Sequence, residues 1–292
     1  MKYLLSLLLI LLVNNASAKG INIDYQKTDS IKIVHLLQEA KRLNSSTNWM
    51  VYFGKKFCGI PYVAKTLERN KEEQLVVNLR ELDCTTFVET TMALTLCMKN
   101  KKTTFHDFCY YLRMIRYQQG NVYYPSRLHY FTQWIDDNSK LGFVSEITAK
   151  TKPFTCIQTL NIDFMSKHID LYPMLCGNKK YIEEIREHEK LLTGRKFRYI
   201  PKSTISNNKL FRQTIKDGDI IVILTSKKGL DTSHIGIAVW KNDGLHLLNA
   251  SSLRHKVVVE PKLLSTYMKG QKSQIGIRVV RLKVGSKNSH LH

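Results

Sequence analysis

The sequence predicts an α+β fold, and two observations lead to this prediction. Apolar residues recur at helical spacing before residue 218, as in Ile31, Val34 and Leu37. From Gly218 onward the pattern changes to short β-rich segments separated by turn signals such as Asn242-Asp243-Gly244. Helices followed by an antiparallel β-meander indicate a single α+β domain.

The first eighteen residues have the pattern of a secretory signal peptide. A basic start, Met1-Lys2, precedes an apolar run from 4 to 13 and a small-residue cleavage site at 16–18. The apolar run is about half the ~20 residues that a spanning helix needs. Lys19 rather than a cysteine follows, so we expect no lipid anchor. The sequence predicts a secreted protein, periplasmic or extracellular, without a transmembrane segment.

The remaining chain has a length that suits one domain. We expect this domain to span 19–284, with a helical and loop insertion at about 103–200 that lines the cleft. Residues 285–292 are expected to form a flexible tail. The expected helices are 30–43, with Asp29 or Ser30 as N-cap, a helix opened by Cys84, 105–116 and 181–192. The expected strands are 219–224, 234–240, 245–250, 257–260 and 275–282.

Charge and cysteine content argue against two classes of protein, nucleic-acid binders and disulfide scaffolds. Forty-five Lys and Arg against 24 Asp and Glu give a formal charge of +21. The cations are scattered, whereas a nucleic-acid binder concentrates them with aromatic residues, so we expect an anionic envelope surface as partner and no nucleic acid. Six cysteines in this length do not form a disulfide scaffold, although a Cys156–Cys176 bridge is possible. We expect no metal and no cofactor.

Cys84 stands where the segment LRELDCTTFVET changes from polar to apolar. If Asp83 is the N-cap, the free N–H groups and the helix dipole should lower the pKa of the thiol and help form an oxyanion hole. The alternative is an ordinary buried helix cysteine. A nucleophile also needs a base.

His234 is the best candidate for that base among ten histidines. It begins the strand HIGIAVW, follows the loop GLDTS, and has Gly236 two residues on, which leaves space on its own face. A hydrogen-bonded sheet histidine is the alternative.

Strand parity selects the residue that should orient the imidazole. If Lys241 faces Gly244 in a tight hairpin, Asn249 faces Gly236 and lies on the same side as His234. His246 then points to the opposite face, although a register slip of one residue would exchange the two. Cys, His and Asn in this chain order are a known set for thiol acyl transfer.

These segments resemble a known family. LDCTTFVE, SHIGIAV and LLNASS are similar to the three motifs of the NlpC-type papain-like peptidoglycan hydrolases, and CGIPYVAKTLE to the segment before their nucleophile. The closer resemblance is to the secreted N-acetylmuramoyl-L-alanine amidase-like branch, through PYVAKTLE, NLRELDCTTFVE, SRLHYFTQWIDDN, DGDIIVILT and GLDTSHIGIAV.

The resemblance implies a papain-like fold, in which the nucleophile helix packs on the meander, with Cys84 as nucleophile and His234 as base. Asn249 stands where this branch often has histidine, and Lys65 where glycine is common. The resemblance also implies a substrate cleft lined by Asp83, Tyr62, Arg127, His129 and Ser233, although a structural role for Arg127 and His129 is equally open.

The implied reaction is hydrolysis of the amide between muramic acid and L-alanine in peptidoglycan or muropeptides. Cleavage at γ-D-glutamyl–diaminopimelate by the same chemistry is a second possibility. A catalytically inert envelope-binding protein is a third, which the intact Cys84 and His234 argue against.

Overall fold

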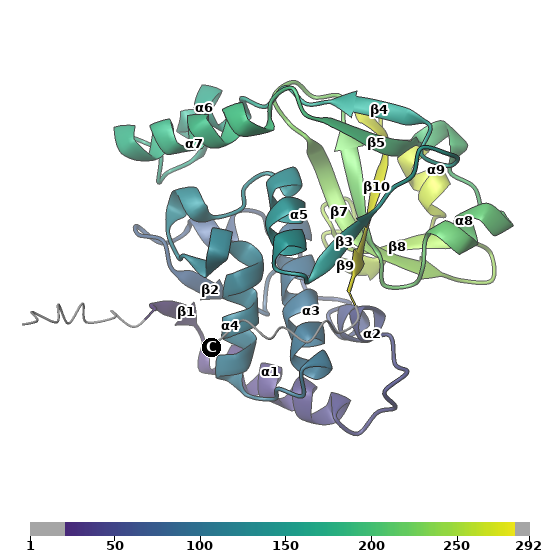
Figure 1. Ribbon diagram of the computed structural model, residues 1–292. Helices are drawn as coiled ribbons and strands as arrows, with labels where there is room; N and C mark the ends of the chain where they lie inside the picture. Colours follow the sequence, from purple (N-terminus) through teal and green to yellow (C-terminus); the bar gives the residue numbers. More distant parts are fainter. Residues whose placement is uncertain (1–20, 284–292) are drawn as a thin grey trace, which may run out of the picture.

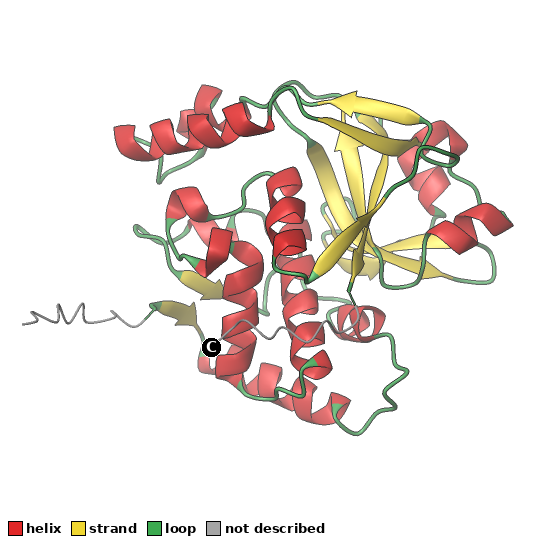
Figure 2. Ribbon diagram, viewed as in Figure 1, coloured by secondary structure: helices red, strands yellow, loops and turns green. Residues whose placement is uncertain are grey.

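The computed structural model describes residues 21–283. The expected signal peptide (1–18), the expected tail (285–292) and residues 19, 20 and 284 at the ends of the expected domain lie outside the described residues. Figure 1 shows the helices of the first half of the chain on one side of a twisted sheet and the short helices α8 (Lys209–Thr214) and α9 (Leu264–Lys269) on its other side. Figure 2 shows the same arrangement coloured by secondary structure. The mixed α+β class is confirmed. None of the described helices is long and apolar enough to cross a membrane.

The helices and strands have the following bounds. The helices are α1 (Lys27–Ala40), α2 (Trp49–Lys56), α3 (Cys84–Lys99), α4 (Phe105–Arg116), α5 (Phe131–Lys140), α6 (Phe164–Lys167), α7 (Lys179–Leu192), α8 (Lys209–Thr214) and α9 (Leu264–Lys269). The strands are β1 (Ile23–Tyr25), β2 (Leu75–Val77), β3 (Val144–Ile147), β4 (Cys156–Thr159), β5 (Lys196–Pro201), β6 (Ile220–Thr225), β7 (Thr232–Trp240), β8 (Leu245–Ser251), β9 (Lys256–Val259) and β10 (Gln274–Leu282).

The first helix begins earlier than the sequence predicts. Its N-cap is Gln26, and Asp29 is the third helical residue. The Asp29 carboxylate accepts hydrogen bonds from Gln26 N at 3.0 Å and from Leu79 N at 3.1 Å. The second bond comes from a segment fifty residues away, which sequence periodicity does not reveal.

The large sheet has the order β4-β5-β10-β6-β7-β8-β9, and β3 also pairs with β10. The meander from β6 to β9 is confirmed, but β10 returns to pair with β6 rather than with β9. β6 has the sequence IIVILT and is buried at every position. Its Ile220, Val222 and Leu224 face the helical core, and Ile221 and Ile223 face the core beneath α8 and α9.

The region from 103 to 200 does not pack as one inserted unit. α4 and α5 contribute Phe108, Leu112 and Trp134 to the main helical core. The segment with α6 and α7 packs around a separate apolar cluster that includes Met165 and Ile185. Only the later part of the expected insertion therefore has a core of its own.

A buried ion pair joins α3 to α4. Arg116 Nε lies 2.7 Å from Glu89 Oε2, both side chains are 2% exposed, and Arg116 Nη1 donates to Val76 O at 2.7 Å. The arginine thus connects both helices and β2. Removing one partner of such a pair leaves the other charge buried and unpaired.

We predict that Arg116→Met lowers the free energy of unfolding by about 3–5 kcal/mol, because the Glu89 carboxylate loses its only cation within 4 Å among the described residues. Arg186→Met breaks an exposed pair with Glu183 and should change it by less than about 1 kcal/mol. Urea unfolding followed by circular dichroism measures both. Equal losses in the two variants would contradict the prediction.

Candidate active site

The first turn of α3 presents Cys84 with two unoccupied amides. Asp83 is the N-cap: its Oδ1 accepts from Thr86 N at 2.8 Å, and Thr86 Oγ1 accepts from Asp83 N at 2.9 Å. This capping box uses the amide of the third helical residue. Within residues 21–283, the backbone N–H groups of Cys84 and Thr85 donate to no other residue, so they remain available to an incoming oxygen.

His234 and Asn249 are joined by a hydrogen bond. His234 Nε2 lies 2.9 Å from Asn249 Oδ1, and Asn249 Nδ2 donates to Leu247 O at 3.1 Å. Because the amide nitrogen is engaged with a carbonyl, the amide oxygen must accept from the imidazole. His234 therefore carries its proton on Nε2, and Nδ1 has the free lone pair that a general base needs.

The hairpin register predicted from the sequence is confirmed. Lys241 and Gly244 exchange backbone hydrogen bonds of 2.9 and 3.2 Å, and Ile237 pairs with Leu248. His246 is turned away from this histidine–asparagine pair: its Nδ1 lies 2.9 Å from Glu260 O and its Nε2 lies 3.0 Å from Asp243 Oδ1. Asn249, rather than His246, is thus the partner of His234.

The thiol of Cys84 lies against the start of β7. Burial raises the pKa of Cys84, and the backbone N–H of Ile235, the residue after His234, opposes that rise. The sulfur also lies 4.0 Å from Thr85 Oγ1. Within the described residues no hydrogen bond joins Cys84 Sγ to the His234 ring. The start of α3 and strand β7 are neighbours, but the thiol does not donate its proton to the imidazole in this structure.

Burial determines the protonation states at this site. Burial and, to a smaller extent, the charge of the Asp83 carboxylate together raise the pKa of Cys84 to about 12, against the opposing contribution of the Ile235 backbone. Burial also lowers the pKa of His234, although the bond to Asn249 and the charge of Asp83 oppose that shift. The lowered thiol pKa expected from the sequence is wrong for this resting state, because desolvation exceeds the effect of the helix start. A neutral thiol therefore stands beside a neutral imidazole.

A second carboxylate anchors the strand that carries His234. Asp231 is 2% exposed, and its Oδ2 accepts from Thr132 N at 2.7 Å. Thr132 is the second residue of α5, whose own N-cap, Tyr130, makes no side-chain cap bond. Arg278 Nη1 donates to Thr132 Oγ1 at 2.9 Å. Asp231 thus caps α5 from a distant loop and ties the start of β7 to it.

Asp231 is not among the residues that the sequence predicts for the site. A signal was available, since Tyr130 is a poor N-cap residue and the helix after it needs an acceptor from elsewhere. The backbone N–H of Ile235 was also missed. The sequence gives no indication of this contact, because the contact depends on how α3 packs against β7.

Of the five residues expected to line the cleft, three lie close to Cys84 or His234. Tyr62 is half-buried beside the thiol: burial, Cys84 and Asp83 raise its pKa to about 12. Asp83 is engaged as the helix cap. Ser233 is exposed next to His234 and donates to Ile223 O at 3.4 Å.

Arg127 and His129 lie in a polar cluster that includes Glu68, Glu73 and Tyr124. Arg127 is 4% exposed, pairs with Glu68, and lies 3.5 Å from Glu73. The His129 ring lies 2.9 Å from Tyr124 O, and burial, followed by the charge of Arg127, places its pKa well below the usual value. Both side chains therefore have polar partners within the protein, and those of Arg127 are carboxylates.

The fold and this site define an α+β protein in which one helix start and two adjacent strands carry a thiol, an imidazole and an amide. The profile of the N-acetylmuramoyl-L-alanine amidase-like family matches residues 52–277, and the chain belongs to this family. No curated protein matches the chain.

Solved structures support the same grouping. An N-acetylmuramoyl-L-alanine amidase from Bacteroides uniformis ATCC 8492 is 39% identical, with a TM-score of 0.75 over 80% of this chain and 98% of that chain. A Bacteroides fragilis protein named as a candidate xylanase is 41% identical, with a TM-score of 0.73 over 78% and 98%. A Legionella pneumophila protein, 23% identical with a TM-score of 0.65 over 87% and 94%, shares the fold.

We predict that iodoacetamide labels Cys176 before Cys84 at pH 7. Cys176 is exposed, whereas Cys84 is partly buried with a raised thiol pKa and stays protonated at neutral pH. Labelling of Cys84 should rise about tenfold for each pH unit up to about 11. Peptide mapping by mass spectrometry measures both sites. Labelling of Cys84 first at pH 7 would instead indicate a thiolate–imidazolium pair.

Proposed function

We propose that this protein is a cysteine amidohydrolase that cleaves the amide between N-acetylmuramic acid and L-alanine in peptidoglycan or muropeptides. The observation that carries the proposal is the 2.9 Å bond between His234 Nε2 and Asn249 Oδ1, which leaves Nδ1 free as a base next to the strand segment that contacts Cys84. The family and the Bacteroides uniformis relative support the choice of substrate. The resemblance to the NlpC-type papain-like superfamily agrees with this order of nucleophile, base and amide.

The mechanism begins with the neutral pair. His234 Nδ1 takes the thiol proton as the sulfur attacks the amide carbonyl carbon. The carbon–sulfur bond forms, and the carbonyl electrons move onto oxygen, where the N–H groups of Cys84 and Thr85 can stabilise the charge. Because burial raises the pKa of the Cys84 thiol, proton transfer and attack are coupled rather than sequential.

The tetrahedral intermediate then collapses and breaks the carbon–nitrogen bond. The departing amine takes the proton from His234, and the acyl group remains on Cys84. Water next attacks the thioester, gives a proton to His234, and releases the carboxylic acid. That proton returns to the departing sulfur, which regenerates the neutral pair. Asn249 holds the ring orientation through both halves of the cycle.

The site chemistry favours amide cleavage over glycoside cleavage, which one relative's name suggests. Glycoside hydrolysis uses a pair of carboxylic acids on either side of the bond. Asp83, the carboxylate that acts on both Cys84 and His234, is already bonded to Thr86 as a helix cap.

The setting of the reaction is part of the proposal. The signal-like residues 1–18 suggest secretion to a periplasm or beyond the cell, and the +21 charge suits an anionic envelope surface. The domain is proposed to extend over residues 19–284.

Defined muropeptides test the proposed bond. We predict that the wild-type protein releases the intact stem peptide with a free L-alanine amino terminus, and that Cys84→Ala abolishes this product while Cys97→Ala keeps most of it. Cys97 is buried on the same helix, thirteen residues on. Mass spectrometry distinguishes the outcomes: a fragment cut after D-glutamate indicates the endopeptidase alternative, and no product from the wild type indicates an inert envelope binder.

The role of Asn249 has its own test. We predict that Asn249→Ala lowers turnover by about 10–1000-fold, because His234 loses the partner that orients its ring. His246→Ala removes bonds to Asp243 and Glu260 on the other side of β8, so it should lower thermal stability but leave turnover per folded molecule nearly unchanged. Steady-state rates normalised to folded protein measure the difference. The reverse order of effects would exchange the two assignments.

A further inference from the structure

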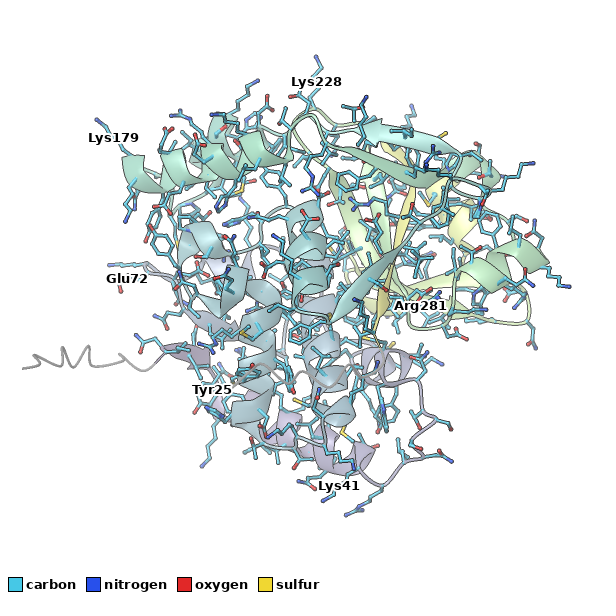
Figure 3. All side chains as sticks on the ribbon, viewed as in Figure 1. Tyr25, Lys41, Glu72, Lys179, Lys228 and Arg281 are labelled. Carbon is cyan, nitrogen blue, oxygen red and sulfur yellow. The ribbon has the colours of Figure 1, made fainter. Side chains whose placement is uncertain are left out.

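A cavity of about 780 Å³ lies at the opposite end of α3 from Cys84. Its wall includes Met98 and Lys99 at the end of α3, which are about 20 Å from Cys84 by helical rise. In Figure 3, Lys41 of this cavity and Lys228 of the loop before β7 lie at opposite ends of the molecule. The cavity is therefore separate from the candidate active site.

Apolar side chains from several segments line the cavity. Leu43 and Trp49 come from the α1–α2 connection and the start of α2, Met98 from α3, and Leu282 from the end of β10. Leu43 is 41% exposed, so its side chain is accessible to a ligand at the cavity wall. The volume lies within the range of ligand pockets, which are mostly apolar with a few polar groups.

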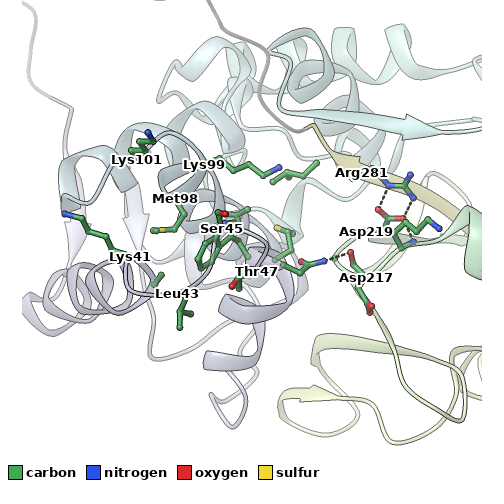
Figure 4. A pocket seen from close by; sticks show the side chains of 18 of the residues that line it. Lys41, Leu43, Ser45, Thr47, Met98, Lys99, Lys101, Asp217, Asp219 and Arg281 are labelled. Atoms are coloured by element: carbon green, nitrogen blue, oxygen red, sulfur yellow. Dashed lines mark hydrogen bonds and ion pairs between the residues drawn. The ribbon is translucent and has the colours of Figure 1, made fainter.

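Cations exceed anions around this apolar surface. Figure 4 shows Arg281 paired with Asp219 across the cavity wall; the two guanidinium bonds are both 2.7 Å. That pair is neutral overall. Lys41, Lys99 and Lys101 make no salt bridge to a carboxylate within residues 21–283. The rim thus has uncompensated positive charge.

Lys99 is the cation best placed to bind a ligand. It is partly buried, and its ammonium donates to Lys283 O at 3.0 Å, which leaves further donors unused. Burial lowers the pKa of Lys99. An anion beside it would offset that cost, since a desolvated ammonium is stabilised by an opposite charge.

We propose that this cavity binds a single-chain anionic amphiphile, with its carboxylate at Lys99 and its apolar chain against Leu43, Trp49 and Met98. Charge complementarity selects the anion, and the apolar wall selects a chain rather than a sugar or a free inorganic ion. The site is independent of hydrolysis at Cys84.

Isothermal titration calorimetry with decanoate below its micelle concentration tests the site in the full-length protein, and octyl glucoside serves as the uncharged probe. Decanoate should bind the wild type, with octyl glucoside at least about tenfold weaker. Lys99→Met should weaken decanoate binding by about tenfold or more, the scale of a lost charge-assisted hydrogen bond. Lys202→Met is the matched control, because Lys202 also donates to a backbone carbonyl, Gln271 O, at 3.0 Å. It should bind decanoate as the wild type does.

A second variant tests the apolar wall without disturbing the core. Leu43→Asp places a carboxylate at an exposed position of the cavity and should also weaken decanoate binding by about tenfold or more, whereas Leu191→Asp, at a 72% exposed leucine of α7, should not. Circular dichroism confirms that each variant is folded.

Several results would overturn the proposal. These are equal binding of the two probes, unchanged binding in Lys99→Met, or no binding of decanoate by the wild type. A dimer in light scattering that Leu43→Asp dissociates would assign the surface to a second copy of the chain. Much tighter binding by a variant ending at Lys283 would assign it to residues 284–292.

Discussion

The hydrogen bond from Thr86 N to the Asp83 carboxylate determines where α3 begins, and the rest of the site depends on that position. If the sequence were shifted by one residue along α3, the thiol of Cys84 would point in a direction about 100° away around the helix axis. The cap also takes up the amide of Thr86 and leaves those of Cys84 and Thr85 free. Asp83 also lowers the fraction of Cys84 that is present as thiolate, because its charge contributes to the raised pKa of the thiol that it positions.

The antiparallel sheet supplies the other half of the site with little freedom of adjustment. The Lys241–Gly244 turn sets the register of β7 against β8, and that register brings Asn249 to His234 while it sends His246 to the other side. Asn249 is 0% exposed, so its amide has no water to bind and must bond within the protein. Its bond to Leu247 O decides the orientation of the amide and, through it, the tautomer of the histidine.

Burial connects the stability of the site to its chemistry. The thiol and the imidazole are both shielded, and each is less costly in its neutral form. A neutral resting pair limits adventitious oxidation or alkylation, since the thiolate is the reactive form. In the proposed reaction, attack on an amide depends on a substrate that brings its carbonyl oxygen to the free N–H groups at the start of α3. Asp231 restricts the loop before His234 by capping α5, so the base keeps its place while the pair is neutral.

The sequence by itself determined the features that depend on local pattern. The change at Cys84 from polar to apolar residues, with aspartate before it, predicted the helix start at its observed residue. The Asn-Asp-Gly turn and period-two alternation predicted the hairpin and the side of Asn249. Lys65, where the family resemblance led us to expect a position that favours glycine, has a left-handed backbone with φ of 61°.

Only the tertiary structure decided features that join distant segments or depend on solvent. The place of β10 beside β6, the capping of α5 by Asp231, and the bond from Ile235 to Cys84 each link parts of the chain that have no common pattern. The pKa of the Cys84 thiol was likewise decided by the tertiary structure. A helix start is visible in the sequence and favours the thiolate, but the desolvation that outweighs it depends on how completely the sheet and neighbouring side chains exclude water.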